Sequence, residues 1–118
     1  MTSMTKFVDA NVIIGSWSDP AAENLMGALN KETHATSVLA LAEAYRKLQK
    51  KGIGNLFEFF RELLANMAVY DVSIGDFFNA IKSNVQLSIN DKMHIEVMKR
   101  NTISTIISFD KDFDKVNT

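Results

Sequence analysis

The sequence predicts one α/β domain, spanning residues 1–118, in which helices pack on a short and mostly parallel sheet of about four strands. Three observations indicate this class. The length of 118 residues suits a single domain. Short apolar runs alternate with longer segments of helical periodicity, as in strands joined by crossover helices. The apolar runs are nearly continuous, which is typical of strands buried on both faces.

The N-terminal half is expected to supply two strands and two helices. Segment 6–14 begins as a strand, because its apolar residues form a nearly continuous run. Pro20 follows a Ser-Asp pair and opens a helix over about 20–30. A short strand at 34–36 leads to a helix over about 37–51, whose first residue is a serine cap.

The C-terminal half continues the alternation. An aromatic-rich helix is expected at about 55–66, followed by a strand at 68–72. An S-x-x-D sequence, the form of a capping box, opens a helix over about 73–84. A further helix over about 88–101 leads to a buried strand at 104–109.

The composition excludes several classes of protein. With 13 Lys and Arg against 14 Asp and Glu, the chain lacks the bulk positive charge of proteins that coat nucleic acid. Without cysteine it forms no disulfides, thiolate zinc sites or cysteine nucleophiles. Its apolar runs are too short to span a membrane, and its N-terminus lacks the apolar segment of a signal peptide. A cytoplasmic protein with no membrane association is expected.

Three acidic residues occupy positions that favour a shared site. Asp9 lies near the end of the first apolar run, and Asp110 directly follows the last expected strand. Ligands of parallel sheets bind beyond the carboxyl ends of the strands. Asp91 shares the apolar face of its helix with His94, where a carboxylate is costly unless it is paired or binds a metal.

Glu43 is a fourth candidate, and it points away from the apolar stripe expected on its helix. That stripe consists of Val38, Leu41, Tyr45 and Leu48. Periodicity alone does not decide whether Glu43 faces solvent or a groove. Local roles are the alternative: Glu43 could pair with Lys47, and Asp91 and Asp110 could cap helices or turns. Asp9 has no comparable local role beyond a turn.

Clustered carboxylates point to a hard divalent cation. Without a metal they would repel one another, which raises some of their pKa values. Mg²⁺ and Mn²⁺ prefer oxygen ligands, and one or two such ions can activate water and stabilise the leaving oxygen of a phosphodiester. A histidine, cysteine or lysine nucleophile is then unnecessary.

Four sequence blocks, in order along nearly the whole chain, resemble the motifs of the PIN domain family. They are FVDANVII, TSVLALAEAYRKLQ and, holding the third and fourth motifs, INDKMHIEVMKRNTISTIISFDKDF. The length is similar to that of the single-domain toxin nucleases called VapC. The resemblance implies an α/β/α sandwich around a parallel sheet and RNA cleavage that depends on Mg²⁺ or Mn²⁺. It also implies a homodimer inhibited by a small antitoxin.

The resemblance also assigns roles to residues. The acidic quartet that binds metal and carries catalysis falls on Asp9, Glu43, Asp91 and Asp110. Supporting polar positions fall on Asn11, Ser37, Ser108 and the accessory acid Asp112. The chain departs from the family pattern at Lys92, which stands where small residues are commoner and could neutralise the site or contact phosphate.

Other side chains have both a functional and a structural interpretation. Arg46, Lys47 and Lys50 share a side with Glu43 and could guide an RNA backbone, but cations also suit the last turn of a helix. His94 is expected to be a packed residue rather than a ligand. An apolar surplus is expected to serve the core in part and a partner surface in part, and its aromatic members are Phe57, Phe59, Phe60, Phe77 and Phe78.

The first hypothesis is therefore a metal-dependent endoribonuclease, the toxin of a toxin–antitoxin pair. The alternative is a catalytically silent module of the same fold that binds RNA or a protein partner. A phosphoryl-transfer hydrolase is a weaker third hypothesis, since no acid lies two residues after Asp9. Stabilisation by Mn²⁺ relative to EDTA separates the first two hypotheses.

Overall fold

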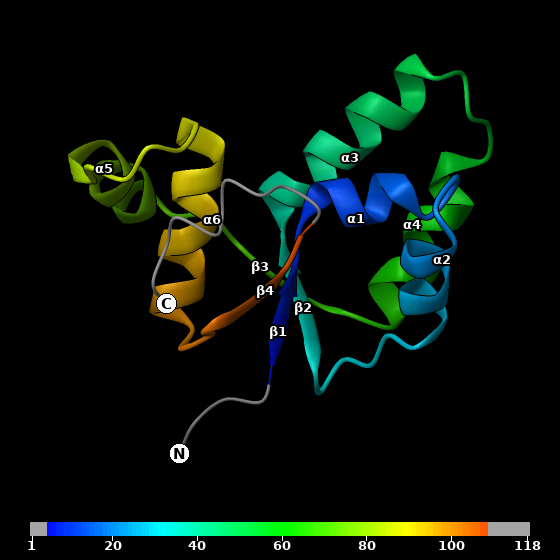
Figure 1. Ribbon diagram of the computed structural model, residues 1–118, viewed down its shortest axis with the longest axis horizontal. Coiled ribbons are helices and arrows are strands. Elements are labelled where there is room, and N and C mark those ends of the chain that lie inside the picture. The colour runs from blue at the N-terminus through cyan, green and yellow to red at the C-terminus, as the bar shows by residue number, and fades with distance from the viewer. Residues whose placement is uncertain (1–4, 109–118) are drawn as a thin grey trace.

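The computed structural model describes residues 5–108 and has a four-stranded sheet at its centre, with the strand order β3-β2-β1-β4 (Figure 1). Every neighbouring pair of strands is parallel, and Phe7 aligns with Ala35 on one side and Ile106 on the other. The strands are β1 (Lys6–Val8), β2 (His34–Ser37), β3 (Ala68–Tyr70) and β4 (Thr105–Ile107). The predicted parallel sheet of four strands is confirmed.

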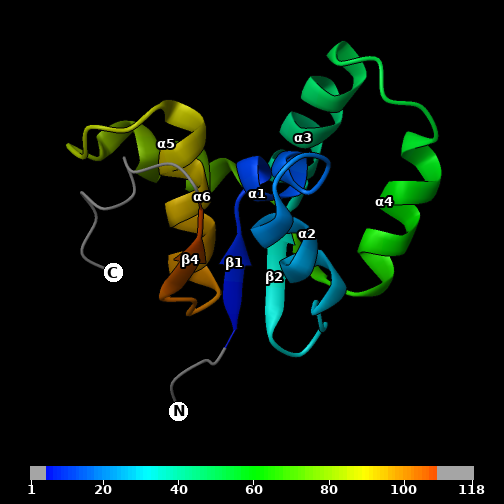
Figure 2. The ribbon, with the colours of Figure 1, turned by 45° about the vertical axis from the view of Figure 1, so that its right-hand side comes forward.

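The helices form a layer on each side of this sheet. In Figures 1 and 2 the first four helices lie on one side, and the last two lie together on the other. The helices are α1 (Ala10–Gly15), α2 (Pro20–Gly27), α3 (Val38–Lys50), α4 (Leu56–Ala65), α5 (Ile74–Lys82) and α6 (Ile89–Arg100). The three-layer α/β/α arrangement is therefore also confirmed. Within the described part of the chain, no helix is long and apolar enough to cross a membrane.

The first apolar run differs from its expected form. It is a three-residue strand followed at once by helix α1, and Asp9 is the extended residue between the two. Val12 and Ile13 lie next to each other in α1 and are both fully buried, whereas in a strand their side chains would point to opposite faces of the sheet. A short apolar run cannot distinguish a buried strand from a buried helical turn, since both lack polar positions.

The buried face of α3 also differs from the predicted stripe. Two residues of the predicted stripe do face the core: Leu48 is fully buried and Leu41 packs against the buried cluster. The other two, Val38 and Tyr45, are 50% and 44% exposed, whereas Ala40 and Ala44 are fully buried. The small side chains share the face that packs against the rest of the fold, and α1 is a principal neighbour of α3. Large apolar residues are common on protein surfaces, so size and apolarity misidentified part of this face.

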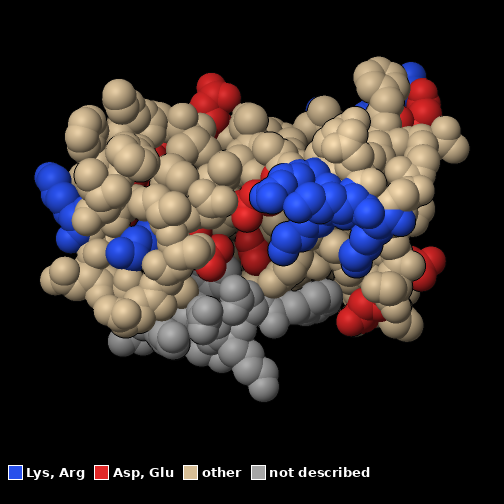
Figure 3. All heavy atoms as spheres, turned by 90° about the horizontal axis from the view of Figure 1, so that it is seen from above, with Lys and Arg blue, Asp and Glu red and all other residues tan. Residues whose placement is uncertain are grey.

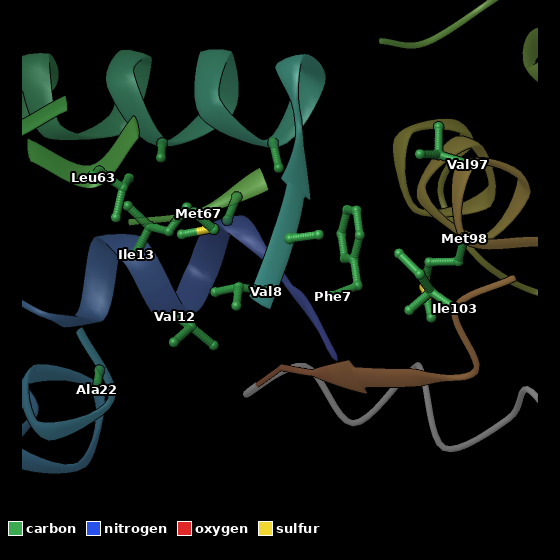
Figure 4. Close-up of a cluster of buried hydrophobic side chains, with 14 of the residues drawn as sticks. Phe7, Val8, Val12, Ile13, Ala22, Leu63, Met67, Val97, Met98 and Ile103 are labelled. Carbon is green, nitrogen blue, oxygen red and sulfur yellow. The ribbon is translucent and has the colours of Figure 1, made fainter. Parts of the chain in front are cut away.

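The core lies on both faces of β1, whose Phe7 and Val8 are fully buried (Figure 4). Because successive side chains of a strand point to opposite faces, the two contact different layers. In Figure 4, Val8 points toward the side of α1, and Phe7 points toward α6. The short strand β1 thus fixes both helical layers relative to the residue that follows it, Asp9.

Helices α5 and α6 are joined by an ion pair in which the carboxylate is buried and the guanidinium is partly exposed. Arg100 donates to the two oxygens of Asp76 from Nε at 3.1 Å and Nη2 at 2.9 Å. The expected capping box is present, because Ser73 accepts from the Asp76 N–H and donates its own N–H to the Asp76 carboxylate. Burial alone would raise the pKa of Asp76, but the hydrogen bonds from Arg100 and Ser73 outweigh it and hold the pKa below its usual value.

Candidate metal centre

A cleft of about 330 Å³ opens beyond the carboxyl ends of the strands. Figure 3 looks onto this end of the molecule and shows acidic side chains at its centre, directly beside a large basic patch. Three of the predicted acids line the cleft, together with Asn11 and Lys47; these acids are Asp9, Glu43 and Asp91. The fold therefore brings three of the four predicted acids to one place.

Asp9 is held between β1 and α1 at the floor of this cleft. Its backbone N–H donates to the carbonyl of Ile107 at 3.0 Å, which fixes it to the neighbouring strand β4. Its side chain accepts a hydrogen bond from Ser108 Oγ at 2.9 Å. Burial raises the pKa of Asp9, while His94, the Ser108 hydroxyl and the Ala10 N–H act in the opposite direction without cancelling it. The protein alone does not fully compensate this buried charge.

Asn11 and Ser108, two of the predicted supporting residues, order the side of the cleft next to Asp9. Asn11 Nδ2 donates to Ser108 Oγ at 3.3 Å, and Ser108 in turn donates to Asp9 Oδ2. The contact joins α1 to the residue that follows β4. It therefore restrains one oxygen of the Asp9 carboxylate.

Asp91 enters the cleft from the first turn of α6. Ser88 Oγ accepts a hydrogen bond from the Asp91 N–H at 3.2 Å, so the capping role of this segment is real. The Asp91 carboxylate nevertheless lies close to that of Asp9: one oxygen from each and one nitrogen of His94 all lie within 4.8 Å of one another. Capping and site formation are therefore compatible at this position.

His94 is the residue of the site that sequence reasoning missed. As predicted it is fully buried, with its ring 5.5 Å from that of Phe7. Its Nε2 nevertheless lies 2.8 Å from Glu43 Oε1 and 3.9 Å from Asp9 Oδ1. The spacing of three residues from Asp91, which puts both side chains on one helical face, was the signal that could have identified it.

Ser37, the third supporting residue, lies behind His94. It caps α3 by accepting from the Ala40 N–H at 3.1 Å, and its Oγ lies 3.4 Å from His94 Nδ1. Ser37 thereby links the start of α3 to the imidazole that contacts Glu43 on the same helix.

The donor set suits a divalent cation of the Mg²⁺ type. Asp9 and Asp91 offer carboxylate oxygens within a few ångströms of each other, and Glu43 lines the same cleft. Burial is the main cause of the raised pKa of Asp9, and a bound cation would stabilise the charge that burial disfavours. Hard cations prefer oxygen ligands, so the residues present fit such an ion.

Two predicted acids and the predicted cations remain to be considered. Asp110 and Asp112 fall outside the described residues. The Lys92 ammonium donates to the carbonyl of Ser83 at 3.0 Å and lines a separate cleft formed by residues 83–88. The Lys92 ammonium is thus directed to a backbone carbonyl, and its suggested role in neutralising the acidic site or contacting phosphate stays a prediction. Of the α3 cations, Lys47 lines the acidic cleft.

Comparison with known proteins places this fold in a family. Residues 6–118 match the model of the PIN domain. No curated protein matches the chain in sequence.

Several solved structures share the fold at low sequence identity. A toxin–antitoxin complex from Klebsiella pneumoniae matches with a TM-score of 0.72 and 16% identity, covering 92% of this chain and 90% of that chain. VapC20 from Mycobacterium tuberculosis, described as a toxin that cleaves the sarcin-ricin loop, gives 0.71 and 19%, with 97% and 100% covered. VapBC2 from Rickettsia felis, bound to a DNA fragment from its promoter, gives 0.64 and 15%, with 94% and 91% covered.

Proposed function

The chain belongs to the PIN domain family, and from this premise we propose that it is a metal-dependent endoribonuclease whose active site is the acidic cleft. One observation carries the proposal: Asp9 and Asp91, from opposite ends of the chain, place carboxylate oxygens within 4.8 Å of each other. Two buried or half-buried carboxylates so close together are costly without a cation.

Asp9 and Asp91 are the residues that would hold Mg²⁺ or Mn²⁺, and we include Glu43 and Asp110 in the catalytic site from their positions in the sequence motifs. When bound, such an ion activates water and stabilises the leaving oxygen of a phosphodiester. Ser108 and Asn11 hold the Asp9 carboxylate in place through their hydrogen bonds. Glu43, from α3, completes the set of ligands or orients the attacking water.

The proposed substrate is RNA. Arg46, Lys47 and Lys50 are exposed on α3, the helix that also carries Glu43, and Lys47 lines the cleft itself. A row of cations beside the acidic site can bind the phosphates that flank a cleaved bond. Lys92, in the neighbouring cleft of residues 83–88, is a further proposed phosphate contact. The fold shared with a toxin that cleaves the sarcin-ricin loop supports a structured RNA as substrate.

We further propose that the protein is the toxin of a toxin–antitoxin pair. Two of the solved structures with this fold come from toxin–antitoxin systems, which supports an antitoxin protein as partner. A homodimer and a cytoplasmic location belong to the same proposal. Light scattering of the purified chain, alone and with the product of the neighbouring reading frame, tests both assemblies.

The decisive experiment compares Asp9→Asn with the wild-type chain in Mn²⁺-dependent cleavage of an RNA hairpin. We expect cleavage to be abolished, because the substitution removes one proposed ligand charge, while circular dichroism shows a folded protein. Glu32→Gln is the control, since Glu32 is exposed in the turn before β2, at the amino ends of the strands and so at the opposite end from the cleft. A folded and active Asp9→Asn variant would contradict the proposal.

A metal titration separates a nuclease from a silent module of the same fold. At one hundred times its dissociation constant, Mn²⁺ should stabilise the wild-type fold by about 2.7 kcal/mol relative to EDTA. Thermal unfolding that is unchanged by millimolar Mn²⁺ would favour the silent module.

A further inference from the structure

His94 occupies a position that permits two different roles. One of its nitrogens lies with oxygens of Asp9 and Asp91 in a group whose members are all within 4.8 Å of one another, as metal ligands are. The same imidazole contacts Glu43 at 2.8 Å through Nε2, a hydrogen-bonding distance. The two roles exclude each other at Nε2, because a metal needs the lone pair where a donor carries a proton.

The contacts of the ring determine which nitrogen carries the proton. A carboxylate offers only acceptor oxygens, so the 2.8 Å contact between Nε2 and Glu43 Oε1 requires a hydrogen on Nε2. On the other side, Ser37 Oγ already accepts from the Ala40 N–H, so its hydroxyl hydrogen is available to donate to Nδ1 at 3.4 Å. Both contacts are satisfied with a proton on Nε2.

The surroundings also make His94 a fixed anchor. The imidazole is fully buried on α6 and packs against Phe7 of β1, with ring centroids 5.5 Å apart. The Glu43 side chain, in contrast, is 29% exposed and belongs to a flexible residue type. The hydrogen bond therefore restrains mainly Glu43, because His94 is already held in place by packing.

We propose that His94 is a positioning residue: it holds the Glu43 carboxylate in the acidic cleft through Nε2–H and is not a metal ligand. The functional purpose of this positioning rests on the proposed function, whereas the hydrogen bond itself does not require a metal. It follows that the ion is held by oxygen atoms alone. Imidazole favours Zn²⁺ and Ni²⁺, whereas oxygen ligands favour Mg²⁺ and Mn²⁺, so the cleft should select the harder ions.

The tautomer of His94 is directly observable in the wild-type chain by long-range ¹H–¹⁵N NMR of its two imidazoles. We expect the Nε2–H form in EDTA and the same form after Mg²⁺ is added. His34 is an internal reference, because its Nδ1 accepts from the Asn30 N–H at 3.3 Å, and His34→Gln assigns the signals. An Nε2 without a proton in EDTA, or loss of the Nε2 proton on addition of Mg²⁺, would overturn the proposal.

A matched pair of substitutions tests the positioning role. In His94→Gln the amide nitrogen falls near the place of Nε2 and can still donate to Glu43, whereas in His94→Asn it falls near Nδ1 and cannot. Loss of a group that orients a ligand typically weakens metal binding 10–100-fold. We expect about tenfold weaker Mn²⁺ binding for His94→Asn and near-wild-type binding for His94→Gln, measured by calorimetry. Equal weakening in both variants would indicate a ligand and overturn the proposal.

These measurements distinguish failure of the inference from failure of the proposed function. If the wild-type chain binds no Mn²⁺, the nuclease proposal fails, and the spectrum in EDTA still decides whether Nε2–H donates to Glu43. Glu43→Gln supplies that decision independently: the Nε2 resonance of His94 should shift, while the resonances of His34 stay unchanged. If the wild-type chain binds Mn²⁺ but Glu43→Gln leaves the His94 signals in place, only the positioning role is wrong.

Discussion

Two buried aspartates of this chain, Asp9 and Asp76, have opposite electrostatic environments. Asp9 is 5% exposed and Asp76 is 3% exposed, so exposed surface does not separate them, although Asp9 lies deeper in the fold. The pKa of Asp9 is raised, chiefly because burial disfavours its charge. For Asp76 the same effect is outweighed by hydrogen bonds from Arg100 and Ser73, and its pKa is lowered.

The difference lies in where the compensating charge comes from. Asp76 accepts two hydrogen bonds from the Arg100 guanidinium, so its charge is compensated by a residue of the same chain. Asp9 has a neutral serine hydroxyl on one oxygen, and an imidazole nitrogen 3.9 Å from the other. A buried carboxylate whose charge the chain does not fully compensate is suited to bind a cation from solution. The first aspartate thus serves a site and the second serves the structure.

The largest expected effect comes from breaking the structural pair. Arg100→Met should lower the free energy of unfolding clearly, because it removes the guanidinium that compensates the buried Asp76 carboxylate. Urea unfolding at neutral pH measures this loss. Lys99→Met is the matched control, since Lys99 is an exposed neighbour on the same helix whose contact with Glu96 is 3.4 Å long, and it should cost less than about 0.5 kcal/mol. Equal losses in the two variants would refute the assignment of the pair.

The second prediction concerns Asp9, where substitution in the absence of metal should increase stability rather than lower it. In EDTA, Asp9→Asn should raise the melting temperature by a few degrees, because it removes an undercompensated buried charge and keeps an acceptor for Ser108. In saturating Mn²⁺ the order should reverse, since only the wild-type chain gains stability from the ion. Differential scanning calorimetry in the two buffers gives both values. A variant less stable than wild type in EDTA would show that the Asp9 charge is already compensated by the protein.

The sequence predicted the parts of this arrangement that depend on position along an element. Asp9 was placed at the end of a strand and Asp91 on the inner face of a helix, and both side chains lie in the cleft. The rule that ligands bind at the carboxyl ends of parallel strands was sufficient for this. The order of the four strands and of helices α2 to α6 was also correct, because alternation of apolar runs is a local signal, but α1 was missed inside the first apolar run.

The missing parts are contacts between elements, which leave no periodic signal. The pair of Asp76 and Arg100 joins two helices through side chains 24 positions apart, and nothing near either residue indicates its partner. His94 looked like a core residue and is one, but its far nitrogen reaches Glu43 on another helix. The face of α3 was only half correct, because two alanines with little apolar surface of their own share its contact with the rest of the fold with Leu41 and Leu48.

The smallest expected effect is the pH dependence of stability, and it is different for the two aspartates. The lowered pKa of Asp76 means that its ionised form is favoured by folding, so its contribution is present above the unfolded pKa of about 3.8 and is lost as pH falls below it. The raised pKa of Asp9 has the opposite sign: in EDTA, stability is lost as pH rises through about 3.8 toward neutrality. The free energy of unfolding should therefore be measured by urea unfolding in EDTA between about pH 3 and pH 6. Arg100→Met should reduce the loss of stability at low pH, and Asp9→Asn should make stability rise more steeply with pH. Identical profiles for the two variants would show that the two carboxylates share one environment, which would end the distinction between a structural and a functional aspartate.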